Sequence, residues 1–231
     1  MTQSRNASLQ SLGSIDRQTR REQILSRLRE AISSGQLAAG THLAEIELSD
    51  ALGVSRGTLR EALRHLQQEG LLISDARGRL SVRKVSGAEV REIFAVRAAL
   101  ESLALAEICA LPDRSEIVND MLTMLDRLKD TEDNFAAQID ADLAFHETLC
   151  TASGNGTLLQ AWLNVSGLAR AAITAAGPET ALNNMAHTRH APFVEFIKSG
   201  DVEAGKQFLE EHMRIAADRI LERMEQSADS E

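Results

Sequence analysis

The first readable pattern in the chain is a set of short amphipathic segments between residues 20 and 84. Apolar residues recur at helical spacing over residues 24–32 and stop at a Ser-Ser-Gly sequence, which predicts a first helix. A second short helix is expected over Glu45–Leu52. Ser55 can then cap a third helix that runs to about Glu69.

Two short apolar runs follow the third helix, over residues 71–73 and 80–84. They flank Asp75-Ala76-Arg77-Gly78-Arg79, a sequence typical of a hairpin turn, here with a basic tip. Three helices and a basic hairpin predict a winged helix-turn-helix. We assign it residues 18–85, after a flexible N-terminal arm over residues 1–17.

From Gly87 onward the pattern changes to long amphipathic helices with almost no strand signal. The fold class is therefore mainly α, with the N-terminal winged helix-turn-helix followed by a C-terminal all-α six-helix bundle over residues 86–231. Glycine-containing breaks separate several of the six expected helices, which cover Gly87–Ala110, Pro112–Asp130, Asn134–Ser153, Thr157–Ala176, Thr180–Ser199 and Asp201–Gln226.

Composition allows one large domain or two of ordinary size, since the 231 residues are 43% hydrophobic, and we expect two. No run of about 18 apolar residues occurs, and the first 18 residues are Ser-rich and polar, so neither a membrane span nor a secretory signal is expected. We therefore expect a cytoplasmic protein. Cys109 and Cys150 lie in apolar helical contexts, which favours buried, reduced thiols over a disulfide or a thiolate metal site.

The net charge of -9 is unevenly distributed along the chain. Residues 17–85 hold 12 Lys and Arg against 8 Asp and Glu, a balance of +4, whereas residues 86–231 hold 12 against 25, a balance of -13. Attraction to phosphate is local, because exposed charges are screened beyond roughly 8–10 Å. The distribution therefore fits a DNA-contacting first domain joined to an acidic second domain.

The third helix carries an arginine at every fourth position, namely Arg56, Arg60 and Arg64, so the three lie along one face. A guanidinium group can bind two phosphate oxygens or the O6 and N7 atoms of guanine, and Ser55 and Thr58 can bond phosphates at the helix start. The alternative is a solvated arginine face on an ordinary helix. Periodicity alone does not decide between the two, but the basic hairpin favours DNA.

The N-terminal segment resembles the DNA-binding domain of the GntR family over nearly all of residues 20–84. The resemblance is carried by Gly40-Thr41-His42-Leu43, Leu52-Gly53-Val54-Ser55-Arg56 and Leu59-Arg60-Glu61-Ala62-Leu63. It implies binding to double-stranded operator DNA, with Ser55, Arg56, Thr58 and Arg60 in the major groove and Arg77 and Gly78 at the wing tip. This chain has Gly57-Thr58 where many relatives have Thr-Pro, so its base preference can differ.

Asp142 and His146 lie four residues apart, on one face of one expected helix, and could bind the same ion. Such a pair also arises as an ordinary surface hydrogen bond or as a core histidine, and alone it favours that interpretation. His190 and His212 strengthen the metal hypothesis. Each lies on a later helix, and bundles build metal sites from inward side chains of facing helices.

The second segment resembles the FCD domain, named for the FadR C-terminal domain, over about residues 87–226. The resemblance is carried by Val96-Arg97-Ala98-Ala99-Leu100-Glu101, Asp142, Phe145-His146, Ser153-Gly154-Asn155, His190, Gly200-Asp201 and His212. It implies the metal-binding type of this domain, with Asp142, His146, His190 and His212 holding a divalent ion. It also implies an all-helical effector-binding and dimerisation domain that senses small organic acids.

Three imidazoles and a carboxylate suit Zn, Ni or Mn and leave the choice open. Arg97 and Arg219 could bind the carboxylate of an effector, although an ordinary salt bridge is an equal alternative for each. Pro192 could kink or start the helix that carries His190, in which case His187 would replace His190 as ligand.

These features predict a transcription regulator, a homodimer on a palindromic operator, whose DNA affinity is modulated by an organic acid bound at the metal ion. A metalloenzyme is a second hypothesis, but no partner base has readable spacing and Tyr is absent, so we predict that the chain is not an enzyme. A DNA-binding protein that senses nothing is a third hypothesis and stays open.

Overall fold

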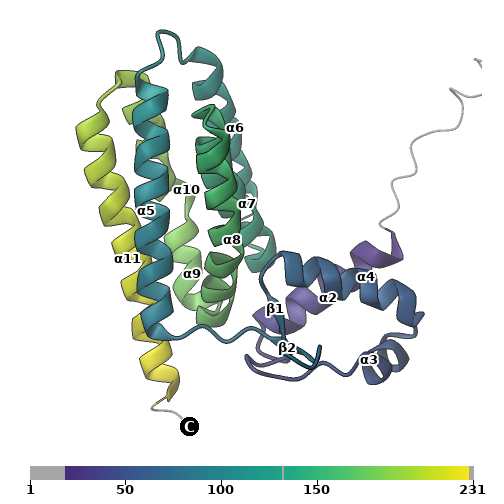
Figure 1. The fold of residues 1–231 in the computed structure, drawn as a ribbon. Coiled ribbons are helices and arrows are strands. Elements are labelled where there is room, and N and C mark those ends of the chain that lie inside the picture. Colours follow the sequence, from purple (N-terminus) through teal and green to yellow (C-terminus); the bar gives the residue numbers. More distant parts are fainter. Residues whose placement is uncertain (1–18, 132, 229–231) are drawn as a thin grey trace, which may run out of the picture.

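A computed structural model of the chain describes residues 19–131 and 133–228. The expected N-terminal arm over residues 1–17 lies outside the described residues. Figure 1 shows a small part containing a hairpin beside a bundle of long, roughly parallel and antiparallel helices. The fold class expected from the sequence is confirmed.

The small part, which we call the head, is a winged helix-turn-helix. Ser55 caps its third helix, because its hydroxyl accepts a hydrogen bond from the backbone N–H of Thr58. The two strands pair antiparallel with Leu72 opposite Val82, and an isolated bridge from His42 to Ser81 extends the wing. The elements are α2 (Arg20–Ser33), α3 (Glu45–Leu52), α4 (Arg56–Gln68), β1 (Leu72–Ser74) and β2 (Leu80–Val82).

The second part, which we call the body, is a bundle in which α5 and α11 lie side by side along much of their length (Figure 1). A capping box of Ser86 and Glu89 begins α5 directly after the wing. The helices are α5 (Gly87–Cys109), α6 (Ser115–Asp130), α7 (Phe135–Ala152), α8 (Gly156–Ala176), α9 (Pro178–Met185), α10 (His187–Ser199) and α11 (Val202–Ala228).

One expected helix, Thr180–Ser199, is divided in two, so the described residues of the body form seven helices rather than six. Pro178 occupies the first turn of α9, and Ala186 adopts an extended backbone with ψ of 137°, which ends α9. The carbonyl oxygen of Ala186 then accepts a hydrogen bond from Nδ1 of His190. Pro192 lies inside α10 and does not displace His190.

Head and body have separate hydrophobic cores. The head core gathers apolar residues between Ile24 and Val82, and the body core gathers those between Val85 and Leu221. Val85 therefore packs with the body, one residue before the expected boundary. The domain division stays a prediction that these two cores support.

Trp162 is buried in the body core, and Cys150 is a buried free thiol whose burial raises its pKa. Cys150 is buried as the sequence predicted, whereas Cys109 is only half-buried. Across the described residues, no helix has both the length and the apolar character needed to cross a membrane.

Candidate nucleic-acid interface and metal centre

The outer face of α4 presents the three arginines. Arg56, Arg60 and Arg64 are exposed, while Leu59 and Leu63 on the opposite face are fully buried in the head core. Because the apolar face of α4 is buried in the head core, its three arginines face outward.

Arg60 has a partner that the sequence did not reveal. Its Nε donates to Oε2 of Glu45 at 2.6 Å, which joins α4 to α3, although the Arg60 side chain is still 61% exposed. An exposed ion pair of this kind contributes little stability, at most about 1 kcal/mol. A phosphate or a guanine can therefore replace Glu45 at low cost.

The wing tip is shaped by Asp75. Its Oδ1 accepts hydrogen bonds from the backbone N–H groups of Arg77 and Arg79, each at 2.9 Å, and its Oδ2 pairs with Nε of Arg79 at 2.7 Å. Gly78 has a φ of 76°, a conformation that other residues rarely adopt. Asp75 consequently holds the turn while Arg77 and Gly78 stay exposed at its tip.

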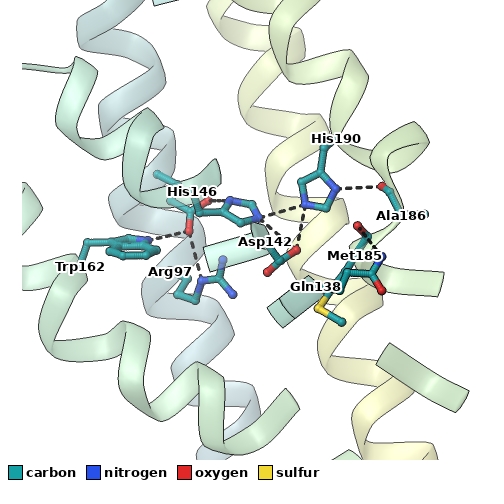
Figure 2. Close-up of polar contacts among 9 residues, drawn as sticks. Arg97, Gln138, Asp142, His146, Trp162, Met185, Ala186 and His190 are labelled. Atoms are coloured by element: carbon teal, nitrogen blue, oxygen red, sulfur yellow. Dashed lines mark hydrogen bonds and ion pairs between the residues drawn. The ribbon is translucent and has the colours of Figure 1, made fainter. Parts of the chain in front are cut away.

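Three buried histidines from three helices converge in the body. His146 on α7, His190 on α10 and His212 on α11 place one ligand atom each within 4.8 Å of one another. Asp142 joins them, since its Oδ1 lies 3.1 Å from Nε2 of His190 and 4.0 Å from Nε2 of His146 (Figure 2). The structure therefore brings together all four residues that the sequence singled out.

The donor set fits a cation. Nδ1 of His146 faces Oε2 of Glu101 at 2.6 Å, and Nδ1 of His190 faces the oxygen of Ala186 at 3.0 Å. These oxygen acceptors place each ring proton on Nδ1 and leave Nε2 as a lone pair. The two Nε2 atoms nevertheless lie 3.2 Å apart, beside the Asp142 carboxylate.

Acceptors without a proton between them repel one another, whereas a metal ion would attract all of them. Metal–nitrogen bonds of about 2.0–2.1 Å put neighbouring ligand atoms about 3.0–3.4 Å apart. The separations of Nε2 of His190 from Nε2 of His146, 3.2 Å, and from Oδ1 of Asp142, 3.1 Å, match this spacing, whereas the 4.0 Å between Asp142 and His146 is wider. The three imidazoles could therefore hold a metal ion, with Asp142 beside them.

The protonation states agree with this fit. Burial opposes ionisation of Asp142, but its contact with the His190 imidazole and the positive charge of Arg97 outweigh burial and lower the pKa of Asp142 to about 2. Burial lowers the pKa of His146, and burial with the neighbouring His190 lowers the pKa of His212 well below its ordinary 6.5. At neutral pH the carboxylate is therefore ionised and these two imidazoles are neutral, as metal ligands must be.

A small cavity adjoins the cluster. Its volume is about 20 Å³, room for about one water molecule. The Arg97 side chain, 2% exposed, lines it, and Nη2 of Arg97 is buried with no hydrogen-bond partner among the described residues. The other lining residues are Phe94, Asp142, His146, Ile173, Asn184, Met185, His212, Met213, Ala216 and Ile220.

The two arginines expected at the effector site differ in position. Arg97 lines the cavity. Arg219 does not line it, but its Nη1 donates at 2.7 Å to Oδ1 of Asn184, which does. His187, the alternative ligand, is the first residue of α10 and is not part of the histidine cluster. Sequence reasoning missed Asn184, because a lone asparagine on a short helix carries no spacing signal.

A seam joins head and body at two glycines. A Cβ on Gly167 of α8 would lie 2.9 Å from the carbonyl oxygen of Glu69, and a Cβ on Gly70 would lie 2.6 Å from backbone atoms of Gly167. Arg29 pairs with Glu69 in the head, and Asp140 pairs with Arg170 in the body at 2.6 Å.

A second cavity of about 30 Å³ lies along the seam, lined by Ile32, Ala39, Leu71, Val82, Arg83, Ala171, Thr174 and Ala175.

The fold defines a winged-helix protein with an all-helical second domain. The family model described as "Bacterial regulatory proteins, gntR family" matches residues 20–82, and the FCD domain model matches residues 92–215. The chain belongs to the GntR family of bacterial regulatory proteins and carries an FCD domain. The resemblance to the GntR family and to the FCD domain is confirmed.

Individual relatives agree with this assignment. The probable D-xylose utilization operon transcriptional repressor of Paenarthrobacter nicotinovorans is 30% identical and covers 79% of this chain and 80% of its own. The uncharacterized HTH-type transcriptional regulator YdhC of Bacillus subtilis (strain 168) is 34% identical, over 48% of this chain and 47% of its own.

A solved structure also matches. The crystal structure of a GntR transcriptional regulator from Rhodococcus sp. RHA1 is 25% identical, has a TM-score of 0.64 and covers 88% of this chain and 98% of its own. GntR-family regulators bind operator DNA, so the chain is a transcriptional regulator and not an enzyme.

Proposed function

We propose that this regulator binds its operator with the head, that Asp142, His146, His190 and His212 hold a divalent metal ion in the body, and that an organic acid bound at this ion changes the operator affinity. The observation that carries the proposal is the convergence of three buried imidazoles and a carboxylate beside a cavity with an unpartnered guanidinium nitrogen. The metal would be Zn, Ni or Mn and would supply an attachment point for a carboxylate.

The DNA-contacting residues proposed for the head are Ser55, Arg56, Thr58, Arg60, Arg64, Arg77 and Gly78. All of these residues except Thr58 are exposed, at the start or on the outer face of α4 or at the wing tip, and Thr58 is half-buried in the first turn of α4; this placement supports the proposal. We further propose that the protein acts in the cytoplasm as a homodimer on a palindromic operator. Val96 and Leu103 of α5 are each 46% exposed and lie seven residues apart on one helix face, which is suited to contact with a second copy.

The cavity now has room for about one water molecule, so we propose that it widens when an organic acid binds. Its lining favours an acid with a short apolar chain over a polyhydroxylated sugar acid. Six of the lining residues are apolar, and Asn184 already uses its amide, accepting from Arg219 and donating to the oxygen of Ala216. Sugar hydroxyls buried there without partners would cost about 1–3 kcal/mol each. Arg219 therefore contributes indirectly, by holding Asn184, and Arg97 is the residue proposed to bind the carboxylate.

Organic acids are expected to raise the thermal stability of the metal-loaded protein. A short-chain aliphatic acid at about 100 times its Kd should stabilise the folded state by about 2.7 kcal/mol. Thermal-shift assays with aliphatic acids and sugar acids side by side measure this gain. At the same concentration we expect a smaller gain from the sugar acids, and we expect no gain from any acid after chelation of the metal. A flat response to every acid would favour the DNA-binding protein that senses nothing.

The seam offers a physical route from the cavity to the head. On α8, Ile173 lines the effector cavity and its neighbour Thr174 lines the seam cavity. On α7, Asp140 faces the seam two residues before Asp142 in the cluster. A ligand that shifts either helix would therefore shift the surface on which the head rests, as a coupled regulator requires.

Gly167→Ala is expected to displace the head from the body, because the added Cβ would meet the backbone of Glu69, which cannot yield as a flexible side chain would. The variant should scatter X-rays as a more extended particle and lose the acid response of DNA binding, with metal content unchanged. Gly156→Ala is the matched control, since it lies on the same helix with open space around it. Unaltered scattering together with a wild-type acid response in Gly167→Ala would contradict this coupling.

A further inference from the structure

One buried carboxylate outside the proposed ligand set has three donors from three helices. Glu101, at the middle of α5, is fully buried. Its Oε2 lies 2.6 Å from Nδ1 of His146, and its Oε1 accepts from Nε1 of Trp162 at 2.9 Å and from Nε of Arg97 at 3.2 Å. The single side chain thus joins α5, α7 and α8.

Packing alone does not account for a charge at this place. Removing a carboxylate from water costs several kcal/mol, and apolar residues of similar volume often replace buried ion pairs without loss of stability. The value of Glu101 therefore lies in what its hydrogen bonds orient. The two partners that matter are a proposed metal ligand, His146, and the residue proposed to bind the effector, Arg97.

We propose that Glu101 is a positioning residue for the metal ligand His146 and for the effector-binding Arg97. This proposal rests on the proposed function of the cluster as a metal site. By accepting the Nδ1 proton of His146, it fixes the tautomer whose Nε2 lone pair faces Asp142 and His190. By accepting from Nε of Arg97, it holds a side chain that lines the cavity and whose Nη2 has no partner among the described residues.

His190 shows the contrast. Its Nδ1 is held by the backbone oxygen of Ala186, an acceptor that no side-chain substitution removes. His146 depends instead on a side chain 45 residues away. A change at Glu101 should consequently free His146 to rotate or to move its proton to Nε2, while the other ligands keep their orientation.

The test is Glu101→Gln in the full-length protein, which keeps the size of the side chain but replaces one acceptor oxygen with a donor. Its affinity for Zn²⁺, measured by competition with a chelator, should fall by about 10–100-fold, the range for outer-shell partners of metal ligands. The absorption spectrum of the Co²⁺-loaded variant should change as well, because the ligand geometry changes. If Glu101 had a purely structural role, a variant that circular dichroism shows to be folded would keep both its Zn²⁺ affinity and its Co²⁺ spectrum.

Glu107→Gln is the matched control, since Glu107 lies on the same helix and bonds Asn155, away from the cluster. If Glu101→Gln does not fold, Glu101→Asp replaces it, because a shorter carboxylate withdraws from His146 while keeping its charge. A loss of tenfold or more in the Glu101 variant but not in Glu107→Gln supports the proposal, and any smaller loss overturns it. Absence of metal binding in the wild type would instead overturn the proposed metal site itself.

Discussion

His190→Ala is expected to abolish stoichiometric metal binding, with an affinity loss beyond the roughly 100-fold seen for outer-shell partners. His190 is the cleaner choice, since His146→Ala should also lose the metal but would leave the buried Glu101 without its shortest hydrogen bond. Metal content after dialysis, measured by mass spectrometry, together with chelator competition, checks the loss. Operator binding without acid should stay within about threefold, because the head has its own core.

His187→Ala is the matched control for this prediction. His187 lies three residues before His190 on α10 and outside the cluster, so its removal should leave the metal content unchanged. Undiminished metal in His190→Ala, or lost metal in His187→Ala, would contradict the ligand assignment.

Arg60→Ala is expected to weaken operator binding by about 5–150-fold, which corresponds to about 1–3 kcal/mol for a bidentate contact to guanine. Loss of a phosphate contact would instead make the plot of log binding constant against log salt concentration less steep, by about one unit of slope. Fluorescence anisotropy on a duplex selected from a random pool, across a salt series, measures both. The same titration should give two chains per duplex, as a homodimer requires.

Arg214→Ala is the control for charge and exposure. Arg214 of α11 is 60% exposed and ion-paired, as Arg60 is, but it lies on the body. Its removal should leave DNA affinity unchanged. Equal affinities for Arg60→Ala, Arg214→Ala and the wild type would remove α4 from the DNA interface, and loss of metal in Arg60→Ala would contradict the division between head and body.

Much of the fold was predictable because local chemistry decides it. Ser55 caps α4 where the sequence predicted, and the hairpin forms around Asp75 and Gly78. The four cluster residues were predictable as well, because Asp142 and His146 share a helix face and the family resemblance supplied His190 and His212. The cap, the hairpin and the Asp142–His146 pair are each signalled by residue type at a fixed spacing.

What could not be predicted depends on long-range packing. Glu101 is 45 residues from His146 and 61 from Trp162, and no spacing rule joins them. The pairing of Arg60 with Glu45 likewise depends on how α3 crosses α4. Gly167 carries no sequence signal, and its importance follows only from the close approach of the Glu69 backbone in the head to α8.

The most direct test of the regulator is the operator affinity of the metal-loaded chain, measured by anisotropy with and without short-chain carboxylic acids. At least one acid should change the affinity by about 5–150-fold, the usual size of coupling between two sites. Chelation of the metal should remove the change. Operator affinity that is identical with every acid, or an acid response that persists in metal-free protein, would contradict the proposed metal-bound effector.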